Sequence, residues 1–129
     1  MAANTTPIFA TTPRSNAAAI SVANTARDGS GTVVTIATAG SNGSIFDVVR
    51  VVATGTTTAG VVRIFIHDGT NYFLYKEILV TAITPSTTVE VFNAELIPTV
   101  PLVMPAGYSI RAATNNAEGF NVIVSGGDF

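Results

Sequence analysis

The chain alternates between short segments rich in β-branched residues and clusters of turn-forming residues. It contains 16 Val, 11 Ile and 19 Thr, but only 4 Leu, 4 Glu, 2 Met and 1 Lys. Branching at Cβ restricts χ1 in a helix and suits a pleated surface, so this bias predicts strands. The Ala-rich run 17–19 is compatible with a helical turn, and we interpret it as strand. We expect about eight strands, at residues 17–22, 32–39, 45–54, 58–66, 70–81, 88–97, 108–114 and 120–125.

Gly, Asn, Asp and Pro separate these segments at short intervals. Such spacing is typical of a sandwich or barrel, whereas a protein of alternating strands and helices has longer repeating units. The predicted fold class is all-β: an antiparallel, jelly-roll-like β-sandwich. With 129 residues the chain suits one core, so we expect a single domain over residues 17–129, preceded by an extended arm over residues 1–16.

The turn around Asp68 and Gly69 decides which side chains share a face of the sheet. A two-residue loop would place Arg63 and Phe65 beside Tyr72 and Leu74, which mixes charge into an apolar face. We therefore favour a three-residue loop with Gly69 in the left-handed conformation. The second face then carries Arg63, Phe65, Phe73 and Tyr75, and is too apolar to be left against water.

The segment 45–54 has the same excess of apolar side chains. In a regular strand both of its faces are mainly hydrophobic, and each carries one charge, Arg50 on one face and Asp47 on the other. Strands that are apolar on both sides need a second cover, which a monomer of this size is not expected to supply. This favours a homo-oligomer. The alternative is that Thr and Ala simply replace charges on a solvated surface.

Two segments are candidates for extended contact surfaces. The arm 1–16 contains Pro7 and Pro13 and could anchor on a neighbour, or it could be a frayed terminus. The segment 97–105 has three prolines among apolar residues, which predicts an edge segment protected from further pairing. Together with the hairpin, these segments supply the candidate partner-contact residues Ile8, Phe9, Phe65, Phe73, Tyr75, Leu102 and Met104.

Composition narrows the range of partners. Charged residues make up only 11% of the chain and the net charge is -2, without the basic block that nucleic acid binding requires. The absence of cysteine excludes disulfides and thiolate metal sites. No apolar run approaches the roughly 20 residues of a membrane helix, so no membrane contact is expected. The chain begins without a secretory signal, which favours synthesis and use in a cytoplasm.

Residues able to carry chemistry are few. His67 adjoins Asp68, but both lie in a predicted turn, where such residues serve geometry. The acidic residues show no spacing typical of a catalytic pair. We expect no enzyme, no cofactor and no metal site. We interpret three strand arginines as members of structural ion pairs, with Arg50, Arg63 and Arg111 each pairing with Asp47, Glu77 or Glu90.

Several runs of sequence carry a resemblance to a known group of proteins. They lie at residues 23–29, 53–60, 63–70 and 105–112 and at the ending Gly126-Gly127-Asp128-Phe129. These runs resemble small structural proteins encoded by tailed phages and prophages, over most of the chain from Ala23 onward. The resemblance implies a virion component, and most closely a capsid decoration (cement) protein that clamps neighbouring major capsid subunits. The motifs mark turns and strands, so no site residues are transferred.

The resemblance and the apolar strands lead to the same expectation. The partners would be further copies of the chain and the major capsid protein, on the surface of a virion made in the host cytoplasm. A symmetric trimer suits the threefold positions of a shell, and a dimer stays open. The alternatives are a tail, neck or fibre-associated structural protein, or a carbohydrate-binding β-sandwich module. For the last, only Tyr72, Tyr75 and Tyr108 could form an aromatic platform, since the chain lacks Trp.

Overall fold

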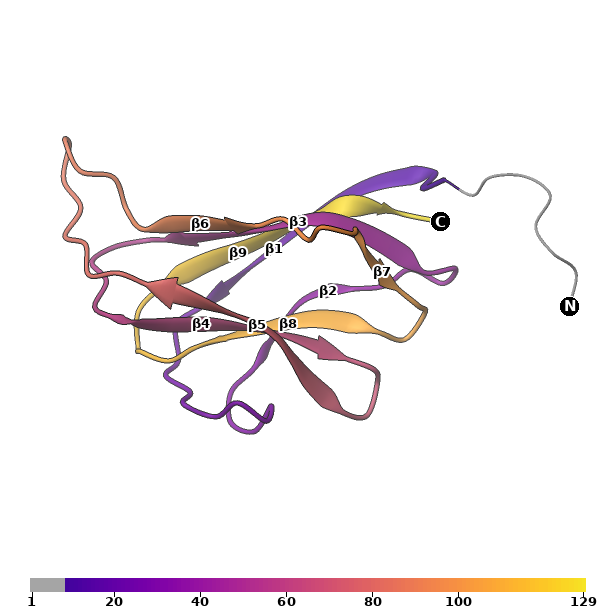
Figure 1. Cartoon of the computed structure of the whole chain (residues 1–129), viewed down its shortest axis with the longest axis horizontal. Coiled ribbons are helices and arrows are strands. Elements are labelled where there is room, and N and C mark those ends of the chain that lie inside the picture. The colour runs from indigo at the N-terminus through magenta and orange to yellow at the C-terminus, as the bar shows by residue number, and fades with distance from the viewer. Residues whose placement is uncertain (1–8) are drawn as a thin grey trace, which may run out of the picture.

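The computed structural model describes residues 9–129, which form nine strands and no helix (Figure 1). Every pairing between these strands is antiparallel. The all-β, antiparallel class predicted from the β-branched composition is confirmed. The strands are β1 (Thr12–Ile20), β2 (Val34–Thr38), β3 (Ser44–Ala53), β4 (Gly60–His67), β5 (Tyr72–Val80), β6 (Asn93–Leu96), β7 (Leu102–Met104), β8 (Ser109–Thr114) and β9 (Phe120–Asp128).

The strands form two sheets that pack face to face. Sheet A has the order β1-β9-β3-β6, with β7 also paired to β3, and sheet B has the order β2-β8-β4-β5. This is the strand order of a jelly roll whose sixth strand is split into β6 and β7. Pro98 and Pro101 lie in the split, where a missing backbone donor interrupts the ladder. The predicted edge segment 97–105 therefore does contain an edge strand, β7.

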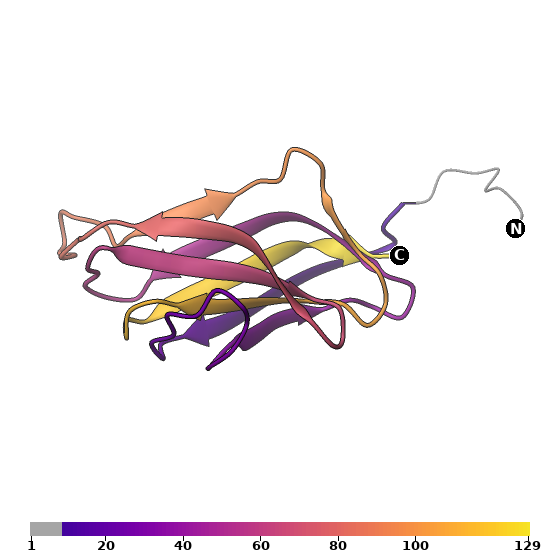
Figure 2. The same ribbon diagram turned by 60° about the horizontal axis from the view of Figure 1, so that its bottom comes forward.

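The two long sides of the sandwich differ. On one side β1 of sheet A lies against β2 of sheet B. On the other side β5 is the last strand of sheet B, and β6 and β7 are the last strands of sheet A (Figures 1 and 2). We call the side bordered by β5, β6 and β7 the open side. Residues 81–92 cross it at one end, where they connect β5 to β6.

The core lies between the sheets and is built from alternate residues of the central strands. Side chains of β3 and β9 meet those of β4 and β8, and nearly all of them are fully buried. Burial of such side chains contributes about 1.5–3 kcal/mol each, which makes this layer the main source of stability. Its largest fully buried members are Phe46, Phe120, Ile64, Met104 and Ile110.

A β-bulge in β3 changes the faces predicted for this strand. Phe46 pairs with Gly126 and Val48 pairs with Ser125, so Asp47 is an extra residue. The bulge places Phe46 on the buried face together with Val49, Val51 and Ala53, and leaves Asp47 and Arg50 exposed. The expectation that each face carries one charge is therefore wrong for β3, because both charges lie on the outer side together with Ile45, Val48 and Val52. A single extra residue converts two mixed faces into one buried apolar face and one exposed mixed face.

Glycine is required opposite this bulge. A Cβ atom at Gly126 would lie 1.9 Å from the carbonyl oxygen of Ile45 and 2.7 Å from Cα of Phe46. No side chain fits there, because the two backbones approach too closely. The close approach of β3 and β9 therefore explains why glycine occupies position 126.

The β4–β5 hairpin also differs from its prediction. His67 pairs with Tyr72, so the loop has four residues, 68–71, and not three. The Asp68 carboxylate closes it by accepting the N–H groups of Thr70 and Asn71, which lowers the pKa of Asp68. Gly69 does adopt the expected positive φ, of 100°. Side chains therefore group as in the alternative we disfavoured, with Phe65 beside Tyr72 and Leu74.

The N-terminal boundary is earlier than predicted. Residues 12–16, assigned to the arm, belong to β1, which pairs with β9 from Thr12 to Ile20. Pro13 is tolerated because β1 is an edge strand. Arg14 fixes the strand from inside: its guanidinium donates to Asp128 Oδ1 at 3.0 Å and to the Thr38 carbonyl at 2.7 Å. Polar contacts to the body of the sandwich, not only β-propensity, hold this segment in sheet A.

Candidate interaction surface

Most of the exposed large hydrophobic side chains of residues 9–129 lie around the open side. They come from β5, from the connection to β6 and from the split between β6 and β7. We call this set the apolar rim: Phe73, Leu74, Leu79, Val89, Ile97, Val100 and Val103. Leu79 and Val100 are each 75% exposed. These side chains come from the segments that border one side of the sandwich, and exposed apolar patches on a protein surface often mark interaction sites.

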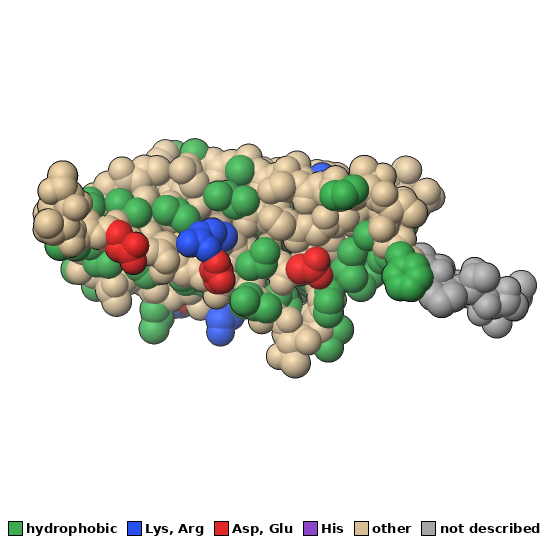
Figure 3. Space-filling model, turned by 90° about the horizontal axis from the view of Figure 1, so that it is seen from above, with side chains coloured by type: hydrophobic (Ala, Val, Ile, Leu, Met, Phe, Trp, Pro, Cys, Tyr) green, Lys and Arg blue, Asp and Glu red, His purple; other side chains and the backbone are tan. Residues whose placement is uncertain are grey.

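Local structure explains why these side chains stay exposed. Leu79 pairs with Val61 on the outer face of sheet B, and Val103 pairs with Ile45 on the outer face of sheet A. Ile97 and Val100 lie beside Pro98 and Pro101, which prevent a continuous strand that could turn them inward. Seen from above sheet A, hydrophobic side chains spread along the molecule with only a few charged ones among them (Figure 3).

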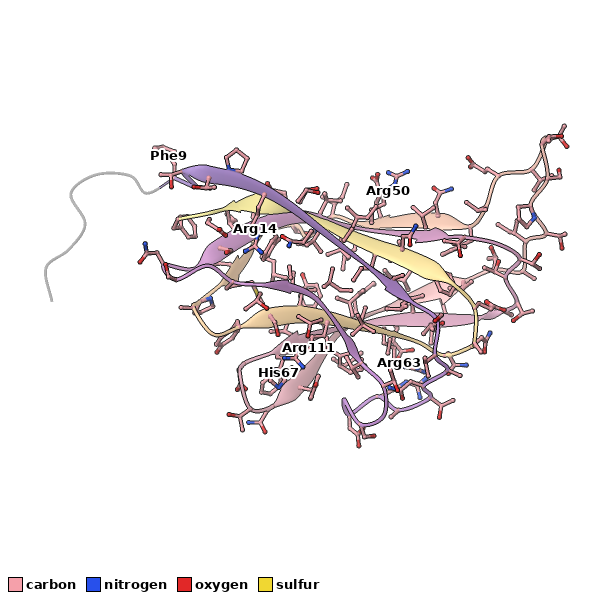
Figure 4. The ribbon with its side chains drawn as sticks, turned by 180° about the vertical axis from the view of Figure 1, so that it is seen from behind. Phe9, Arg14, Arg50, Arg63, His67 and Arg111 are labelled. Atoms are coloured by element: carbon pink, nitrogen blue, oxygen red, sulfur yellow. The ribbon has the colours of Figure 1, made fainter. Side chains whose placement is uncertain are left out.

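The predicted partner-contact residues divide into three groups. Phe73 lies on the apolar rim, and Phe9, just before β1, is 72% exposed (Figure 4). Tyr75 and Leu102 are half-buried against the core. Phe65 and Met104 are fully buried, so their assignment as contact residues is wrong. Ile8 lies outside the described residues.

Phe65 is buried because the chain covers part of its own sheet. The cover loop, which we define as residues 21–33, lies on the outer face of sheet B (Figure 1). Ala23 bridges to Thr114 of β8, and the Asn24 N–H donates to the Thr114 carbonyl at 2.8 Å. A Cβ atom at Gly29, which has a φ of 88°, would lie 2.3 Å from Cβ of Tyr72, so only glycine allows this approach. The inference that a monomer cannot supply a second cover is wrong for this face.

Arg63 lies beneath the cover loop and is only 2% exposed. Its Nη1 donates to the Asn24 carbonyl at 2.9 Å and its Nη2 donates to Asn115 Oδ1 at 3.2 Å. Its Nε has no hydrogen-bond partner among residues 9–129. Through these hydrogen bonds to neutral oxygens, the buried guanidinium connects the cover loop to β4 and to the end of β8. Arg63 therefore has a structural role.

The ion pairs differ from those expected. Arg50 pairs with Glu95 on the outer face of sheet A, and Arg27 pairs with Glu77 at 2.6 Å. The hydrogen bond from Arg27 lowers the pKa of Glu77. Within the described part of the chain, neither Arg63 nor Arg111 has a carboxylate partner. The pairings predicted for these arginines are therefore wrong, because spacing along the chain did not show which strands are neighbours.

A small polar cluster lies beside the cover loop on sheet B (Figure 4). The Tyr72 ring lies 4.4 Å from the His67 ring, and Arg111 Nη1 donates to the Tyr72 hydroxyl at 2.8 Å. His67 Nδ1 accepts the N–H of Gly69 at 3.2 Å, so the histidine supports the hairpin. Residues 9–129 contain no group of three potential metal ligands.

The tyrosines do not form one platform. Tyr75 and Tyr108 pack against the core, whereas Tyr72 contacts Phe65 edge to face and His67. Carbohydrate modules need open, flat aromatic rings, and this arrangement does not supply them. Along residues 9–129 the surface forms no pocket, and no helix able to cross a membrane occurs there.

Sequence reasoning identified part of the apolar rim. The proline-rich segment 97–105 was predicted as a contact surface, and it carries Ile97, Val100 and Val103. Within this segment, however, Leu102 and Met104 were chosen as contact residues, and Leu79 in β5 did not stand out because hydrophobic residues occur throughout the chain.

Comparison with known proteins adds one distant structure. No family model and no curated protein sequence matches the chain. A solved structure described as a pentameric capsid protein isolated from metagenomic phage sequences aligns with 87% of this chain and 61% of its own, at 18% identity and a TM-score of 0.46. The chain thus spans less than two thirds of the length of that protein. This match is too distant to transfer a function.

Proposed function

We propose that this chain is a structural virion protein of a tailed phage. In this proposal it binds the outer capsid surface and stabilises contacts between major capsid subunits, as a decoration (cement) protein. It acts as a homo-oligomer without catalytic activity, and its partners are further copies of itself and the major capsid protein. It is made in the host cytoplasm and located on the virion surface.

The observation that carries the proposal is the apolar rim. Exposed side chains such as Leu79 and Val100 gather on one side of the sandwich, while the chain covers sheet B elsewhere. A surface that remains apolar after the chain has covered its other apolar face needs a partner. The sequence resemblance to small phage structural proteins supports a partner within a virion. The distant capsid-protein match carries no part of this argument.

Many weak contacts acting together suit such a surface. Each copy offers a modest apolar area, and a repeating lattice multiplies it through simultaneous engagement. Shells present both threefold and twofold positions, and the rim is compatible with either a trimer or a dimer.

The number of copies per virion tests the proposal. Quantitative mass spectrometry of purified virions should give a copy number comparable to that of the major capsid protein. A copy number of a few per particle would instead identify a neck, tail or fibre component and would overturn a shell role.

Rebinding to stripped capsids tests the surface. Capsids freed of the protein should take up the wild-type chain, and Val100→Lys should weaken uptake because it places a charge on the rim. Asp47→Lys is the matched control, since Asp47 is exposed on the outer face of sheet A and outside the rim. Equal uptake of all three proteins would contradict a rim contact.

A further inference from the structure

A row of residues that can form hydrogen bonds crosses the outer face of sheet B near the β4–β5 hairpin. Tyr72 of β5 pairs with His67 of β4, and His67 pairs with Ser109 of β8. The residues next to two of them in the sequence, Ile66 and Ile110, pack in the core. Since side chains alternate between the faces of a sheet, Tyr72, His67 and Ser109 lie together on the outer face.

Arg111 of β8 reaches into this row (Figure 4). It follows Ser109 by two residues and therefore lies on the same face. Its Nε donates to Ser109 Oγ at 3.0 Å, and its Nη1 donates to the Tyr72 hydroxyl at 2.8 Å. Within residues 9–129, its Nη2 has no hydrogen-bond partner. The guanidinium is thus fixed in place with one nitrogen free to bind a ligand.

Each side chain of this set has a hydrogen left to donate. The hydroxyl oxygens of Ser109 and Tyr72 accept from Arg111, so each hydroxyl keeps its own hydrogen for another acceptor. His67 Nδ1 accepts the N–H of Gly69, which leaves the proton of the neutral ring on Nε2. No acceptor within residues 9–129 takes any of these hydrogens. We call this set the donor cluster: His67, Tyr72, Ser109 and Arg111.

Free donors of the cluster reach the surface. The buried side-chain polar atoms of residues 9–129 that lack a partner are Nε of Arg63 and Oε2 of Glu118. Nη2 of Arg111 and Nε2 of His67 also lack a partner, but they are not buried. Arg111 and His67 occupy diagonal positions on neighbouring strands, which lie within reach of long side chains. A group from outside can therefore contact both.

Arg111 also lacks the carboxylate that other arginines have. Arg14, Arg27 and Arg50 each form an ion pair with an acidic side chain. Arg63 is buried and held by neutral oxygens. Arg111 is only partly buried, and no carboxylate of residues 9–129 pairs with it. A guanidinium in this setting favours an anion supplied from outside the chain.

Asp68, which adjoins His67, does not serve as that anion. Its carboxylate accepts the N–H groups of Thr70 and Asn71 and closes the hairpin. It forms no hydrogen bond with the side chains of the donor cluster.

From these observations we propose that the donor cluster binds a carboxylate, which an acidic side chain of the protein partner supplies. Carboxylate oxygens accept hydrogen bonds and do not donate them, so they match a cluster whose remaining hydrogens are all donors. Nη2 of Arg111 and Nε2 of His67 are the donors that meet the ligand. One guanidinium suits one carboxylate, whereas nucleic acid phosphates require a basic block, which this chain lacks.

Titration of the isolated chain with sodium acetate tests the site. The NMR signals of the His67 ring report binding, with sodium chloride at the same pH and ionic strength as the reference. The wild-type chain should show shifts that saturate with acetate. Arg111→Gln should weaken the affinity by about tenfold, because it removes the charge that attracts the carboxylate.

Arg50→Gln is the matched control. It removes the same charge from the outer face of sheet A, where Arg50 pairs with Glu95, and it should bind acetate as the wild-type chain does. Shifts that do not saturate, or equal affinities for wild type and Arg111→Gln, overturn the proposal.

Tyr72→Phe provides a second test that keeps every charge of the chain. It removes one hydroxyl donor and the group that holds Arg111 Nη1. Acetate affinity should fall by about threefold, which corresponds to the loss of one hydrogen bond. An affinity equal to that of the wild-type chain contradicts a cluster organised around this hydroxyl.

Uptake on stripped capsids tests the source of the carboxylate, and this part of the inference rests on the proposed function. Arg111→Gln should weaken uptake by about tenfold, whereas Arg50→Gln should leave it unchanged. If Arg111→Gln loses acetate binding but keeps full uptake, the assignment of the ligand to the capsid partner is overturned and the decoration role stands. If the wild-type chain is not taken up at all, the decoration role fails, and acetate binding by the isolated chain still decides whether the site exists.

Discussion

Phe65 and Phe73 lie on consecutive strands of one hairpin, yet they differ in solvent exposure. Phe65 is fully buried beneath the cover loop, whereas Phe73 is 54% exposed on the apolar rim. The cover loop buries part of the outer face of sheet B, whereas the side chains of the rim stay exposed in residues 9–129. The difference teaches that an excess of apolar strand residues does not by itself locate an interface, because a loop from elsewhere in the sequence can bury part of it.

The largest expected effect is on the covered face. Phe65→Ala should lower the free energy of unfolding by about 3–5 kcal/mol, because it removes a fully buried ring and leaves a cavity. Phe73→Ala should cost less than about 1 kcal/mol, since its side chain is half exposed. Urea unfolding of the two variants measures the contrast. Equal losses would mean that the cover loop does not bury Phe65 in solution.

The next largest effect on stability is expected at the buried guanidinium of Arg63. Arg63→Met should cost about 1–3 kcal/mol, because the Asn24 carbonyl and Asn115 Oδ1 lose their donor. Arg50→Met removes an exposed ion pair with Glu95 and should cost less than about 1 kcal/mol. Thermal unfolding at neutral pH compares them. A loss for Arg50→Met as large as that for Arg63→Met would contradict the anchoring role of Arg63.

A smaller effect concerns the ion pair between Arg14 of β1 and Asp128 of β9. The hydrogen bond from Ser44 and the Arg14 guanidinium lower the pKa of Asp128 from its ordinary 3.8. A lowered folded pKa stabilises the protein above the unfolded pKa, and this stabilisation is lost as the pH falls through the folded value. Asp128→Asn should therefore be less stable than wild type at neutral pH, and the gap should narrow below pH 3.8. A gap that stays constant with pH would contradict the ion pair.

The smallest effect on stability is expected on the rim itself. Val100→Lys should change the free energy of unfolding by no more than about 0.5 kcal/mol, because the side chain is already mostly in water. The same variant should weaken uptake on stripped capsids. Denaturant unfolding and uptake measured on one preparation separate stability from binding. A large loss of stability would mean that Val100 is part of the core.

Much of the fold could be predicted from local preferences. The β-branched segments from 32 onward correspond to strands, and the proline-rich segment 97–105 lies at an edge. The errors occurred where one residue alters the register. Asp47 in β3 and Tyr75 in β5 each insert an extra residue, and alternation read without them assigns side chains to the wrong faces.

The candidate site was less predictable. Phe73 was identified from its strand, but Phe65 has the same local pattern and is buried. Only the position of residues 21–33 in space separates the two, and the mostly small and polar residues of this segment give no indication of the face they cover.

The sequence alone determined the all-β class, because Cβ branching and closely spaced turn residues act through local sterics. The tertiary structure decided which apolar surface stays exposed. Burial is a property of segments brought together from distant parts of the chain, such as Asn24 over Arg63. Within residues 9–129, the exposed rim is what remains after that packing is complete.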